Sequence, residues 1–505
     1  MELERLIAAL APEALLGHEP VEVRELAYDA RSATPGAAFF CVRGDRADGH
    51  DFAALAVENG AVALVVERPV ELPAHQAVPQ LVVGDSRAAM AIAADVFFGE
   101  PTKELEVAGV TGTNGKTTTA FLLRSILDAA GRRPGLLGTV ESRVGGEVRP
   151  VVRTTPEAID LQRTFREMLV AGDRSVALEA SSHASALRRL DRVRFDALVF
   201  TNLTQDHLDF HGTMENYYAA KRRLFTGAAP PPAAVNVGDE AGARLAAELA
   251  ETRRAPLVTF GLADGADVRA DDLVLDGSGA RFRAGGIELR TSLRGRFNVE
   301  NVLGAVAASQ LLDVDDEKIA AGVAALAGVP GRFEAVDEGQ PFTVLVDYAH
   351  TPDSLDNVLR SARDLTSGRL LVVFGAGGDR DRGKRPLMGR VAVDLADVVV
   401  VTSDNPRGEE PLAIIQDVLQ GTGTDVEIDP DRGSAIQRVL SQAQPGDVVV
   451  IAGKGHEQGQ EIAGRREPFD DRDAARAALA ELAASRRVPQ GEPPPSASSR
   501  SEEAQ

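Results

Sequence analysis

Hydrophobic and polar positions alternate along this chain with two different spacings. Short runs rich in Val, Leu and Ala recur after residue 103, as in ELEVAGV, RSVALEA, FDALVFTN and PAAVNV, and they predict buried β-strands. Longer segments between these runs, such as KTTTAFLLRSILDAAG, have the spacing of helices. Strands separated by helices predict a parallel sheet that is covered on both faces.

The same alternation restarts after GVPGRFE (328–334), where Pro330 and Gly331 end the preceding helix and predict a hinge. Four more apolar runs follow, each separated from the next by a helical segment that begins at or near a proline: PFTVLVDYAH, RLLVVFGAG, ADVVVVTS and GDVVVIAG. This pattern predicts a doubly wound, Rossmann-like domain.

The beginning and the end of the chain differ from these two regions. Residues 1–103 contain a turn and strand in ARSATPGAAFFCVRG and two buried strands in GAVALVVE and PQLVVGDS, which predict a small α/β domain. Residues 486–505 are rich in Pro, Ser and Glu and are predicted to be disordered. We therefore predict an α/β protein with three domains, at 1–103, 104–328 and 329–485, followed by a tail.

Composition narrows the class of protein. A formal net charge of -21 argues against a nucleic-acid or anionic membrane surface, because such surfaces bind basic faces. Cys41 is the single cysteine, so the chain has no disulfide framework and no cysteine-based zinc site. The first residues, MELERLIAALAPEALLG, lack the basic start of a signal peptide, and no apolar run is long enough to span a bilayer. We expect a cytoplasmic protein that is not inserted in a membrane.

GVTGTNGKTTT (109–119) follows an apolar strand and opens a helix, as a phosphate-binding loop does. Its glycines let backbone N–H groups approach phosphate oxygens, Lys116 supplies a positive charge, and the Thr117 hydroxyl can bind Mg²⁺. The spacing is unusual, because five residues rather than four separate Gly109 from Gly115. The strand, loop and helix together predict a nucleoside triphosphate site.

Two polar clusters follow other predicted strands, LEASSH (178–183) and TNLTQDHLDFHG (201–212). Polar residues at strand ends are where α/β sheets bind ligands, and Mg²⁺ takes one or two carboxylates together with substrate phosphates. We predict Glu179 and His207 as metal ligands; alternatively, Asp206 and the histidines cap a helix. Lys221, judged by pattern alone, is an ordinary solvated lysine of a helix.

Taken together, the motifs identify a family. GTNGKTTT, LEASSH, TNLTQDHLDFHG, GRFNVENVLGA, GVPGRFE and DYAHTPDSL stand in the order found in the Mur ligases, and the resemblance covers roughly residues 25–485. FGAGGDRDRGKRPLMG, TSDNPRGEEP and IAGKGHE resemble the members that use 2,6-diaminopimelate. The resemblance implies that ATP converts the free carboxylate of UDP-MurNAc-L-Ala-D-Glu to an acyl phosphate, which the amine of the diamino acid then attacks. It also implies that the three domains bind, in order, UDP, ATP and the amino acid.

The resemblance assigns residues to the nucleotide and the metals. Those implied to bind ATP are Gly112, Thr113, Asn114, Gly115, Lys116, Thr117, Thr118, Asn298, Asn301, Arg332 and Asp347. Those implied to hold two Mg²⁺ ions are Thr117, Glu179, His207 and Lys221, the last as a carbamate derived from CO₂. Lys116, Glu179, His207 and Lys221 form the implied catalytic set.

The contacts implied for the UDP-sugar-peptide involve Ala30, Ser32, Thr154, Thr155, Ser181, Leu187 and Arg189. Two of these positions depart from the family pattern. The uridine motif D-S-R reads Asp29–Ala30–Arg31 here, so its serine hydroxyl is missing and Ser32 lies two residues on. Leu187 stands where some members have a glutamine. Both departures weaken individual substrate contacts.

The residues matched to diaminopimelate are Arg380, Asp404, Asn405, Pro406, Arg407, Gly453 and Glu457. The far end of diaminopimelate carries an ammonium and a carboxylate, whereas L-lysine carries only the ammonium. Arginine binds a carboxylate through two parallel hydrogen bonds, and oxygen acceptors suit the ammonium. We therefore expect diaminopimelate, because in a lysine-adding enzyme a buried Arg407 would lack a partner.

Other functions remain open at this point. The same fold could add L-lysine, or could be a folate-type polyglutamate ligase, although that class would not need residues 1–103. From a different class, the chain could be a P-loop ATPase or a binding protein for cell-wall nucleotides. We expect a monomer whose partners are small molecules.

Overall fold

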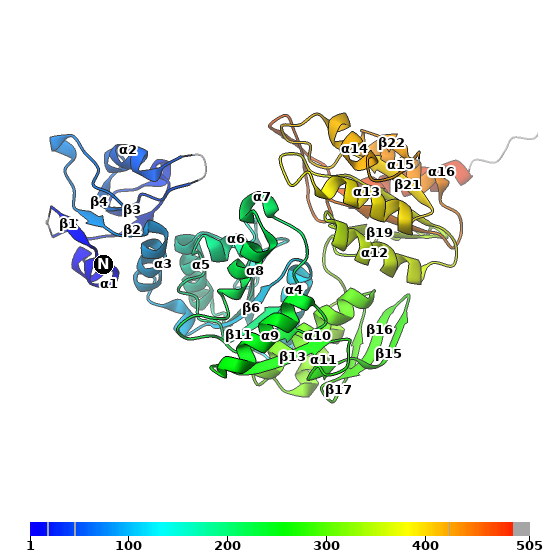
Figure 1. The fold of residues 1–505 in the computed structure, drawn as a ribbon, viewed down its shortest axis with the longest axis horizontal. Coiled ribbons are helices and arrows are strands. Elements are labelled where there is room, and N and C mark those ends of the chain that lie inside the picture. Colours follow the sequence, from blue (N-terminus) through cyan, green and yellow to red (C-terminus); the bar gives the residue numbers. More distant parts are fainter. Residues whose placement is uncertain (18–19, 45–46, 424, 488–505) are drawn as a thin grey trace, which may run out of the picture. The chain divides into compact units, whose positions relative to one another are not determined.

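The computed structural model describes residues 1–17, 20–44, 47–423 and 425–487 (Figure 1). By contacts between Cα atoms the chain divides into two compact units. Unit 1 comprises 1–333, 351–365 and 380–384, and unit 2 comprises the remaining described residues from 334 onward. The predicted tail, 486–505, lies almost wholly outside the described residues, because the last helix ends at Arg487.

Unit 1 begins with a five-stranded sheet of order β1-β5-β4-β3-β2, parallel except for the pairing of β1 with β5. Its strands are β1 (Ala14–Leu16), β2 (Glu25–Ala27), β3 (Ala37–Phe40), β4 (Ala61–Val66) and β5 (Gln80–Val82), and its α-helices are α1 (Leu3–Leu10), α2 (Ala53–Glu58) and α3 (Ser86–Phe97). Successive side chains of β3 point to opposite faces, so Phe39 and Phe40 belong to two different cores. The core that contains Phe40 also includes Ala158 and Ile159 of α5 (Ala158–Ala171), a helix of the next sheet, and so joins the two sheets.

A nine-stranded sheet of order β14-β13-β12-β11-β6-β10-β7-β8-β9 follows. Its strands are β6 (Glu106–Thr111), β7 (Pro134–Leu137), β8 (Ser142–Val144), β9 (Glu147–Arg149), β10 (Ser175–Glu179), β11 (Ala197–Phe200), β12 (Ala233–Asn236), β13 (Leu257–Gly261) and β14 (Val268–Arg269). Seven strands are parallel as predicted, but β8 and β9 add an antiparallel edge. Gly145 and Gly146, with φ of +58° and +85°, form the tight turn that this hairpin requires.

Helices cover both faces of this sheet, as the apolar pattern predicted. One core combines alternate strand residues such as Val110 with α4, α10 and α11, and the other combines residues such as Val107 with α5, α6, α8 and α9. The helices of this part are α4 (Lys116–Ala129), α5 (Ala158–Ala171), α6 (Ser182–Ala186), α7 (Leu208–His211), α8 (Met214–Arg222), α9 (Glu240–Thr252), α10 (Arg296–Leu311) and α11 (Asp316–Ala325), with α12 (Pro352–Leu365) also in unit 1.

A three-stranded antiparallel sheet was not predicted. It consists of β15 (Asp271–Asp276), β16 (Gly279–Ala284) and β17 (Ile287–Thr291), and Figure 1 shows these strands beside α10 and α11. Exposed and buried residues alternate along all three strands, because only one face packs on the core. The run RFRAGGIELRT shows this alternation in the sequence, but it has too few apolar residues to resemble a buried strand.

Unit 2 contains the predicted Rossmann-like sheet, with order β18-β19-β23-β20-β21-β22. Its strands are β18 (Glu334–Ala335), β19 (Thr343–Asp347), β20 (Leu370–Phe374), β21 (Val398–Thr402), β22 (Glu427–Asp429) and β23 (Val448–Ala452), followed by the hairpin β24 (Gln460–Ile462) and β25 (Arg465–Glu467). The helices are α13 (Lys384–Leu395), α14 (Pro411–Leu419), α15 (Arg432–Gln442) and α16 (Asp471–Arg487). All strands of the six-stranded sheet are parallel except β18, and the carboxyl ends of β20, β21 and β23 therefore meet at one edge.

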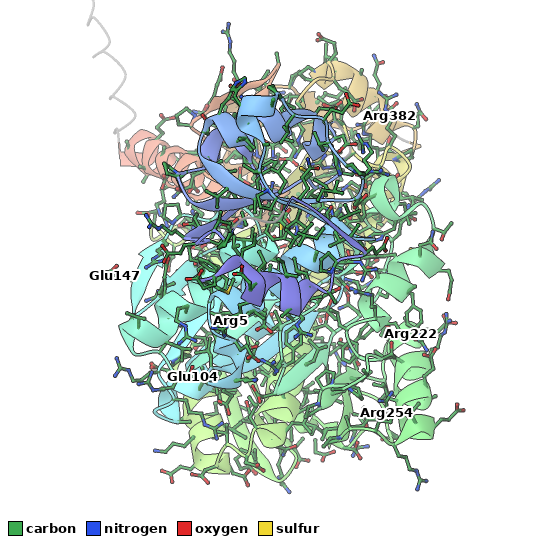
Figure 2. The ribbon with its side chains drawn as sticks, turned by 90° about the vertical axis from the view of Figure 1, so that its left-hand side faces the viewer. Arg5, Glu104, Glu147, Arg222, Arg254 and Arg382 are labelled. Atoms are coloured by element: carbon green, nitrogen blue, oxygen red, sulfur yellow. The ribbon has the colours of Figure 1, made fainter. Side chains whose placement is uncertain are left out.

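Charged side chains such as those of Arg5, Glu147 and Arg254 are exposed (Figure 2). No helix within the described ranges is long and apolar enough to cross a membrane. Cys41 is buried as a free thiol in the first sheet.

Candidate active site

The predicted phosphate-binding loop joins the end of β6 to the start of α4. Gly112 has a φ of +146°, and a Cβ on it would overlap the hydroxyl of Thr201 at the end of β11. That hydroxyl donates to the carbonyl of Asn114 at 2.6 Å, and the Asn114 N–H donates to Asn202 Oδ1 at 2.9 Å. Residues that follow a neighbouring strand thus hold the loop in place, and only glycine allows this close approach.

Lys116 is the first residue of α4, and its ammonium turns back over the loop. Nζ donates to the carbonyls of Gly112 at 3.0 Å and Thr113 at 2.7 Å. Burial lowers the pKa of Lys116, although Glu179 and Asp206 partly oppose this shift. A positive charge with only carbonyl partners at a helix N-terminus is a suitable receptor for phosphate oxygens.

Glu179 ends β10 and is 1% exposed. Its Oε1 accepts from the backbone N–H of Thr139 at 2.7 Å, and its Oε2 accepts from the Thr139 hydroxyl at 3.0 Å. A Cβ on Gly138 would overlap Glu179 Oε1, so glycine is needed beside this carboxylate. Thr139 is a site residue that the sequence reasoning missed, although it follows the apolar run PGLL as the other polar clusters follow theirs.

Lys221 is 1% exposed, which differs from the solvated lysine that its pattern indicates. Its Nζ donates to the carbonyl of Gly112 at 2.7 Å and lies 4.6 Å from the centre of the Tyr217 ring. Burial, reinforced by the charge of Lys116, holds the pKa of Lys221 well below its usual value. The pattern failed here because α8 has few apolar residues, while the loop that covers it comes from a distant part of the chain.

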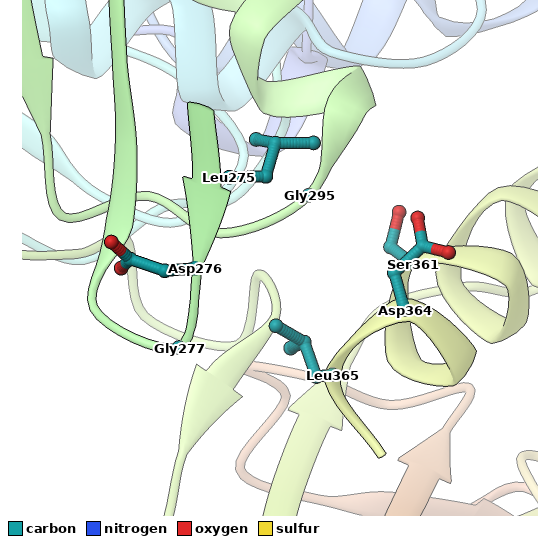
Figure 3. Close-up of a pocket in the computed structure, with 7 residues that line it drawn as sticks. All are labelled: Leu275, Asp276, Gly277, Gly295, Ser361, Asp364 and Leu365. Atoms are coloured by element: carbon teal, nitrogen blue, oxygen red, sulfur yellow. The ribbon is translucent and has the colours of Figure 1, made fainter. Parts of the chain in front are cut away.

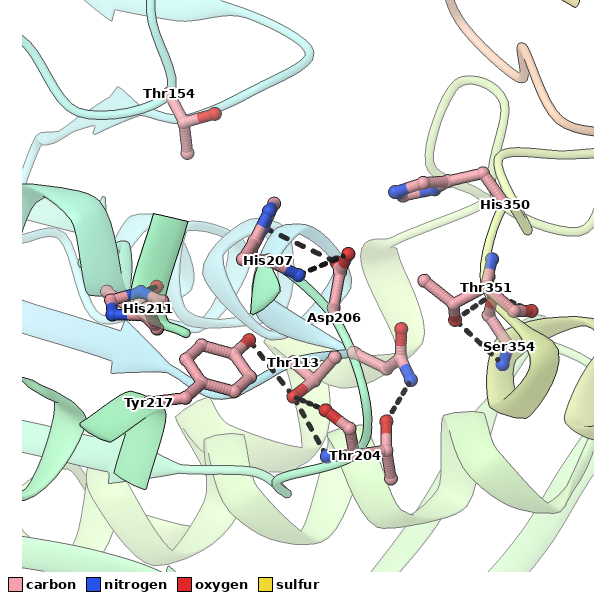
Figure 4. A network of polar contacts seen from close by, with 12 residues as sticks. Thr113, Thr154, Thr204, Asp206, His207, His211, Tyr217, His350, Thr351 and Ser354 are labelled. Atoms are coloured by element: carbon pink, nitrogen blue, oxygen red, sulfur yellow. Dashed lines mark hydrogen bonds and ion pairs between the residues drawn. The ribbon is translucent and has the colours of Figure 1, made fainter. Parts of the chain in front are cut away.

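The rings of His207, His211 and Tyr217 gather in one cluster (Figure 4), and Lys221 contacts this cluster through Tyr217. The ring centres of His183 and His207 are 4.7 Å apart, and His211 stacks on Tyr217 at 5.0 Å. The Tyr217 hydroxyl lies 3.1 Å from Thr113 Oγ1, which connects this cluster to the phosphate loop. Burial lowers the pKa of His211 to about 4, so this histidine is neutral at pH 7.

His207 precedes α7 in a left-handed conformation with φ +54°. Its backbone N–H donates to Asp206 Oδ1 at 2.8 Å, and its Nε2 lies 3.3 Å from Asp206 Oδ2. Asp206 therefore contacts both the backbone and the ring of the histidine, whereas among the described residues α7 has no side-chain capping hydrogen bond, contrary to the capping alternative. The ring is nevertheless 38% exposed, which leaves it accessible to a ligand.

The other nucleotide residues predicted in unit 1 pack against the loop. Gly115 has a φ of +85°, and a Cβ on it would overlap the side chain of Asn301 in α10. Asn301 Nδ2 donates to Asn298 Oδ1 at 3.0 Å, so the two amides are coupled. Arg332 Nη2 donates to the Thr117 hydroxyl at 3.1 Å. Asp347 lies in unit 2 at the end of β19, where its Oδ1 accepts from the Ala349 N–H at 2.7 Å.

The donor set suits Mg²⁺ bound together with phosphates. Within the described ranges, no three His, Cys, Asp or Glu side chains form a cluster that could hold a metal unaided. Mg²⁺ ordinarily binds one or two carboxylates and completes its shell with phosphate and water, which the Thr117 hydroxyl and the Glu179 carboxylate allow. Lys221 as an ammonium has no lone pair and fits a metal only after it becomes a carbamate.

The residues matched to the UDP-sugar-peptide lie in unit 1, and four of them are connected to Glu179. Thr154 Oγ1 lies 3.0 Å from Thr139 Oγ1. Thr155 Oγ1 donates to the Glu179 carbonyl at 2.7 Å and lies 3.1 Å from Ser181 Oγ. Arg189 Nη1 donates to the Thr155 carbonyl at 3.1 Å, and Arg189 Nη2 pairs with Glu157 at 2.8 Å.

The three remaining positions of that set lie apart from Glu179. Ala30 and Ser32 form one short 3₁₀ turn, which Asp29 caps by accepting from the Arg31 N–H at 3.0 Å. The Ser32 hydroxyl donates to the Asp29 carbonyl at 3.0 Å, so it is directed at its own turn. Leu187 ends α6 and is partly buried. These contacts give no replacement for the missing serine and glutamine groups.

The loop DNPR follows β21 in unit 2 and is firmly held. Gly378, which follows β20, donates its N–H to the Asn405 carbonyl at 2.9 Å, and a Cβ on Gly378 would overlap the Pro406 carbonyl. The β24 hairpin binds the other side, because the Arg407 N–H donates to the Glu461 carbonyl at 2.9 Å. The loop is thus built against the ends of two segments that are distant in sequence.

The Arg407 guanidinium has partners within the protein, contrary to the expectation that it would lack one without a substrate carboxylate. Its Nη1 donates to the Gly378 carbonyl at 2.8 Å, and its Nε lies 3.3 Å from Glu461 Oε2. Its side chain is 22% exposed and its φ is +53°. The missing-partner argument against lysine therefore fails, whereas the match between guanidinium and carboxylate still favours diaminopimelate.

The other predicted contacts to diaminopimelate surround this loop or lie in unit 1. Gly453, with φ +122°, follows β23 and donates its N–H to the Asp347 carbonyl at 3.0 Å. Glu457 Oε2 accepts from Asn405 Nδ2 at 2.8 Å. Asp404 is 6% exposed, and its carbonyl accepts from Gln460 Nε2 at 2.6 Å. Arg380 belongs to unit 1, and its role stays a prediction.

A fully buried arginine with two partly buried carboxylate partners, which the sequence reasoning missed, supports the same loop. Arg385 of α13 is 0% exposed, and it binds both oxygens of Glu409 at 2.7 and 3.0 Å and Asp417 at 2.8 Å. Glu409 Oε1 also accepts from the Asp379 N–H at 2.7 Å. Glu409 belongs to the stretch SDNPRGEEP, but no sequence signal links it to an arginine 24 residues earlier.

A separate hollow of unit 1 contains none of the predicted site residues (Figure 3). It is lined by Leu275, Asp276, Gly277, Gly295, Ser361, Asp364 and Leu365. Its two charged side chains are both acidic, which disfavours a phosphorylated ligand. The phosphate loop and its surroundings remain the candidate site.

Comparison with known families agrees with this geometry along most of the chain. Three family models match in order: Mur ligase family, catalytic domain, over residues 22–98; Mur ligase middle domain, over 110–309; and Mur ligase, glutamate ligase domain, over 331–455.

Individual relatives match over nearly their whole length. A protein of Geobacillus thermodenitrificans, named UDP-N-acetylmuramoyl-L-alanyl-D-glutamate--2,6-diaminopimelate ligase, is 48% identical over 475 residues, covering 91% of this chain and 95% of its own. A protein of the same name from Solibacter usitatus is 47% identical, covering 94% of this chain and 96% of its own. A solved structure with that name has a TM-score of 0.65 and 34% identity, covering 92% of this chain and 96% of its own.

Proposed function

We propose, on the premise that this chain belongs to the Mur ligase family, that it joins meso-diaminopimelate to the D-Glu carboxylate of UDP-MurNAc-L-Ala-D-Glu. The reaction consumes ATP, releases ADP and phosphate, and belongs to the synthesis of peptidoglycan precursors in the cytoplasm. The observation that carries this proposal is the 48% identity, over 91% of the chain, to a relative named for that ligation. The buried Lys116, Glu179 and Lys221 around one loop support it.

The chemistry begins with two anions that repel each other. A carboxylate oxygen of D-Glu attacks the γ-phosphorus of ATP, the bond from that phosphorus to the ADP oxygen breaks, and an acyl phosphate forms. Lys116 offers its ammonium to the phosphate oxygens in place of the Gly112 and Thr113 carbonyls that it contacts at 3.0 and 2.7 Å. The backbone N–H groups at the start of α4 add partial positive charge.

Peptide-bond formation completes the reaction. The amine of the diamino acid, having lost one proton, attacks the acyl carbon, the tetrahedral intermediate collapses, phosphate leaves, and an amide remains. The second proton of the nitrogen is released to solvent or to phosphate. The protein's contribution at this stage is to hold the two substrates in line, which can be worth several kcal/mol of the barrier.

Thr117, Glu179, His207 and Lys221 are the residues that we propose to hold Mg²⁺. When bound, the ions neutralise phosphate oxygens and bring the carboxylate and the γ-phosphate together. Thr139 fixes Glu179 through two hydrogen bonds, at 2.7 and 3.0 Å, and Asp206 contacts His207. These contacts orient the ligands before any metal arrives.

Lys221 is proposed to act as a carbamate, which forms when its neutral amine adds to CO₂ with loss of a proton. Burial supports this, because it favours the neutral amine, the form that reacts with CO₂. The nearby Lys116 disfavours a second ammonium but stabilises a carbamate anion. The change therefore converts a repulsive pair of cations into an attractive ion pair.

We propose diaminopimelate rather than L-lysine because of the charges at the DNPR loop. Arg407 is the cation for the far carboxylate, and Glu457 supplies an oxygen acceptor for the far ammonium. Asn405 Nδ2 donates to Glu457 Oε2 at 2.8 Å, so Asn405 orients this carboxylate. L-lysine would satisfy the acceptor and gain nothing from the arginine.

The proposal is tested by phosphate release from ATP in the presence of Mg²⁺ and UDP-MurNAc-L-Ala-D-Glu, with meso-diaminopimelate or L-lysine added in parallel. We expect release with diaminopimelate, and a kcat/KM for it that exceeds that for lysine by roughly a hundredfold or more, because the carboxylate contact is lost with lysine. Equal rates, or a preference for lysine, would refute the specificity. No release with either amino acid would favour a nucleotide-binding protein that does not ligate.

A further inference from the structure

A buried ammonium lies against the DNPR loop and is not among the predicted substrate contacts. Lys454 follows β23, and its side chain is 0% exposed. Its Nζ donates to Asn405 Oδ1 at 2.9 Å and to Glu457 Oε2 at 3.1 Å, and it lies 3.6 Å from Asp404 Oδ1. Two of the three ammonium hydrogens are therefore used in hydrogen bonds, and Asp404 lies near enough to form an ion pair but beyond hydrogen-bond distance.

Lys454 determines which way the Asn405 amide is turned. Because the ammonium only donates, Asn405 must direct its oxygen toward it, and the Glu461 N–H donates to that same oxygen at 3.0 Å. The amide nitrogen is then left to donate to Glu457 Oε2 at 2.8 Å. A rotated amide would place its N–H₂ against two donors and its oxygen against a carboxylate.

Glu457 is held as a carboxylate by the same groups. Burial alone would raise its pKa, but the charge of Lys454 and the hydrogen bond from Asn405 hold that pKa below its usual value. Oε2 takes both of these contacts, and Oε1 accepts no hydrogen bond from any described residue. The side chain is 27% exposed, so one negatively charged oxygen stays accessible.

Among the described residues, Lys454 is the cation that donates hydrogen bonds to Asn405 and Glu457. Arg432 is also buried beside the loop and attracts Asp404 and Glu457 through its charge, but its hydrogen bonds go to both oxygens of Asp471 at 2.7 Å and to the carbonyls of Ser403 and Ala452. Removing Lys454 would therefore leave Arg432 unable to orient the Asn405 amide or Glu457, and would weaken the charge compensation of the buried carboxylates.

We propose that Lys454 is a positioning residue for the amino-acid substrate, because it fixes Asn405 and Glu457 so that one Glu457 oxygen is presented to an ammonium group of the diamino acid. This inference rests on the proposed function. Lys454 is too deeply buried to touch the substrate, so its effect is carried through the two side chains that it orients.

The test is the variant Lys454→Met, which keeps the length of the side chain and removes the charge and the donors. We expect the KM for diaminopimelate to rise roughly tenfold or more, because the charge-assisted hydrogen-bond network that presents Glu457 to the substrate ammonium is lost. The KM values for ATP and for the UDP-dipeptide should change by less than about twofold, since neither is proposed to contact this loop.

Arg369→Met is the matched control. Arg369 forms an ion pair with the buried Asp447 at 2.8 Å. These residues precede β20 and β23, so they lie at the amino ends of the strands, whereas the DNPR loop lies at the carboxyl ends. The Arg369→Met variant should have a lower melting temperature and an unchanged KM for diaminopimelate. If Lys454→Met does not fold, Lys454→Gln keeps amide donors without the charge, and the same rise in KM is expected.

The outcomes separate the two proposals. If the unmodified protein shows no phosphate release that depends on diaminopimelate, the proposed function and this inference both fall. If it does, and Lys454→Met has an unchanged KM for diaminopimelate with a lower melting temperature, Lys454 is only structural and this inference alone is overturned. An equal rise in all three KM values would also overturn it.

Discussion

Two lysines at the phosphate loop lie in buried surroundings that disfavour their charged forms. Lys116 and Lys221 both lie against the Gly112 carbonyl, and the pKa of each is lowered by burial. Two neighbouring ammonium groups in a site of low dielectric destabilise the fold by themselves, so their presence indicates a function that requires them.

Lys221→Met should therefore separate activity from stability. For the protein without the carbamate, we expect the melting temperature to stay the same or rise, because the variant removes a buried amine that Lys116 repels when protonated and keeps the packing volume. Phosphate release should fall by roughly a hundredfold or more, because one anchor of the charged site is lost. Thermal unfolding and the phosphate assay measure the two effects. A melting temperature several degrees lower would show that the ammonium stabilises the fold.

Sequence patterns predict such residues only in part. GKTTT after an apolar strand indicates Lys116, because the phosphate loop is a local structure. Lys221 could be selected only by resemblance, since its burial depends on a loop more than a hundred residues earlier. Arg385 and Lys454 were missed for the same reason: their partners are brought to them by the order of strands in the sheet.

At the scale of elements, the loop after β21 is built by its neighbours. Gly378 lies against the Pro406 carbonyl, and the β24 hairpin binds Asp404, Asn405 and Arg407 through Gln460 and Glu461. Strands β19, β20, β21 and β23 could be predicted from their apolar runs, but β18, β22 and this hairpin could not, because their strands have only two or three residues each.

Gly378→Ala tests this construction. The new methyl group would overlap the Pro406 carbonyl, so the DNPR loop must move, at a cost of about 1–3 kcal/mol. We expect a lower melting temperature and a higher KM for diaminopimelate, with the KM for ATP unchanged, as measured by thermal unfolding and steady-state kinetics.

Gly433→Ala is the control for that substitution. Gly433 lies in the first turn of α15, where a Cβ would make only ordinary contacts, the nearest at 3.4 Å. Alanine there should leave the kinetics unchanged and the stability equal or slightly higher. A KM for diaminopimelate that is the same in Gly378→Ala as in the unmodified protein would show that the loop tolerates displacement.

At the scale of the whole molecule, the described residues form separate hydrophobic cores. One core of the six-stranded sheet, which includes Val346, Val373 and Ile451, contains only residues of unit 2, whereas the first two sheets of unit 1 share a core through α5. Cooperative unfolding follows shared packing, so the two units should unfold as distinct transitions.

Calorimetry should resolve these transitions and assign them with ligands. ATP with Mg²⁺ should mainly stabilise unit 1, which contains the phosphate loop. At an ATP concentration of about 100 times its Kd, the free energy of unfolding of unit 1 should increase by about 2.7 kcal/mol, and its transition temperature should rise. Diaminopimelate should mainly raise the transition temperature of unit 2. A single transition whose calorimetric and van't Hoff enthalpies agree would contradict this division.

The ion pair between Arg407 and Glu461, at 3.3 Å, makes recognition of the amino acid an exchange of partners. A substrate carboxylate must displace a resident carboxylate, so it contributes only the difference between two similar interactions. Affinity for diaminopimelate is thereby moderated. An amino acid without that carboxylate, such as L-lysine, leaves the pair of Arg407 and Glu461 intact and gains nothing from Arg407. Glu461 therefore lowers the affinity for diaminopimelate, while the preference for diaminopimelate over L-lysine is preserved.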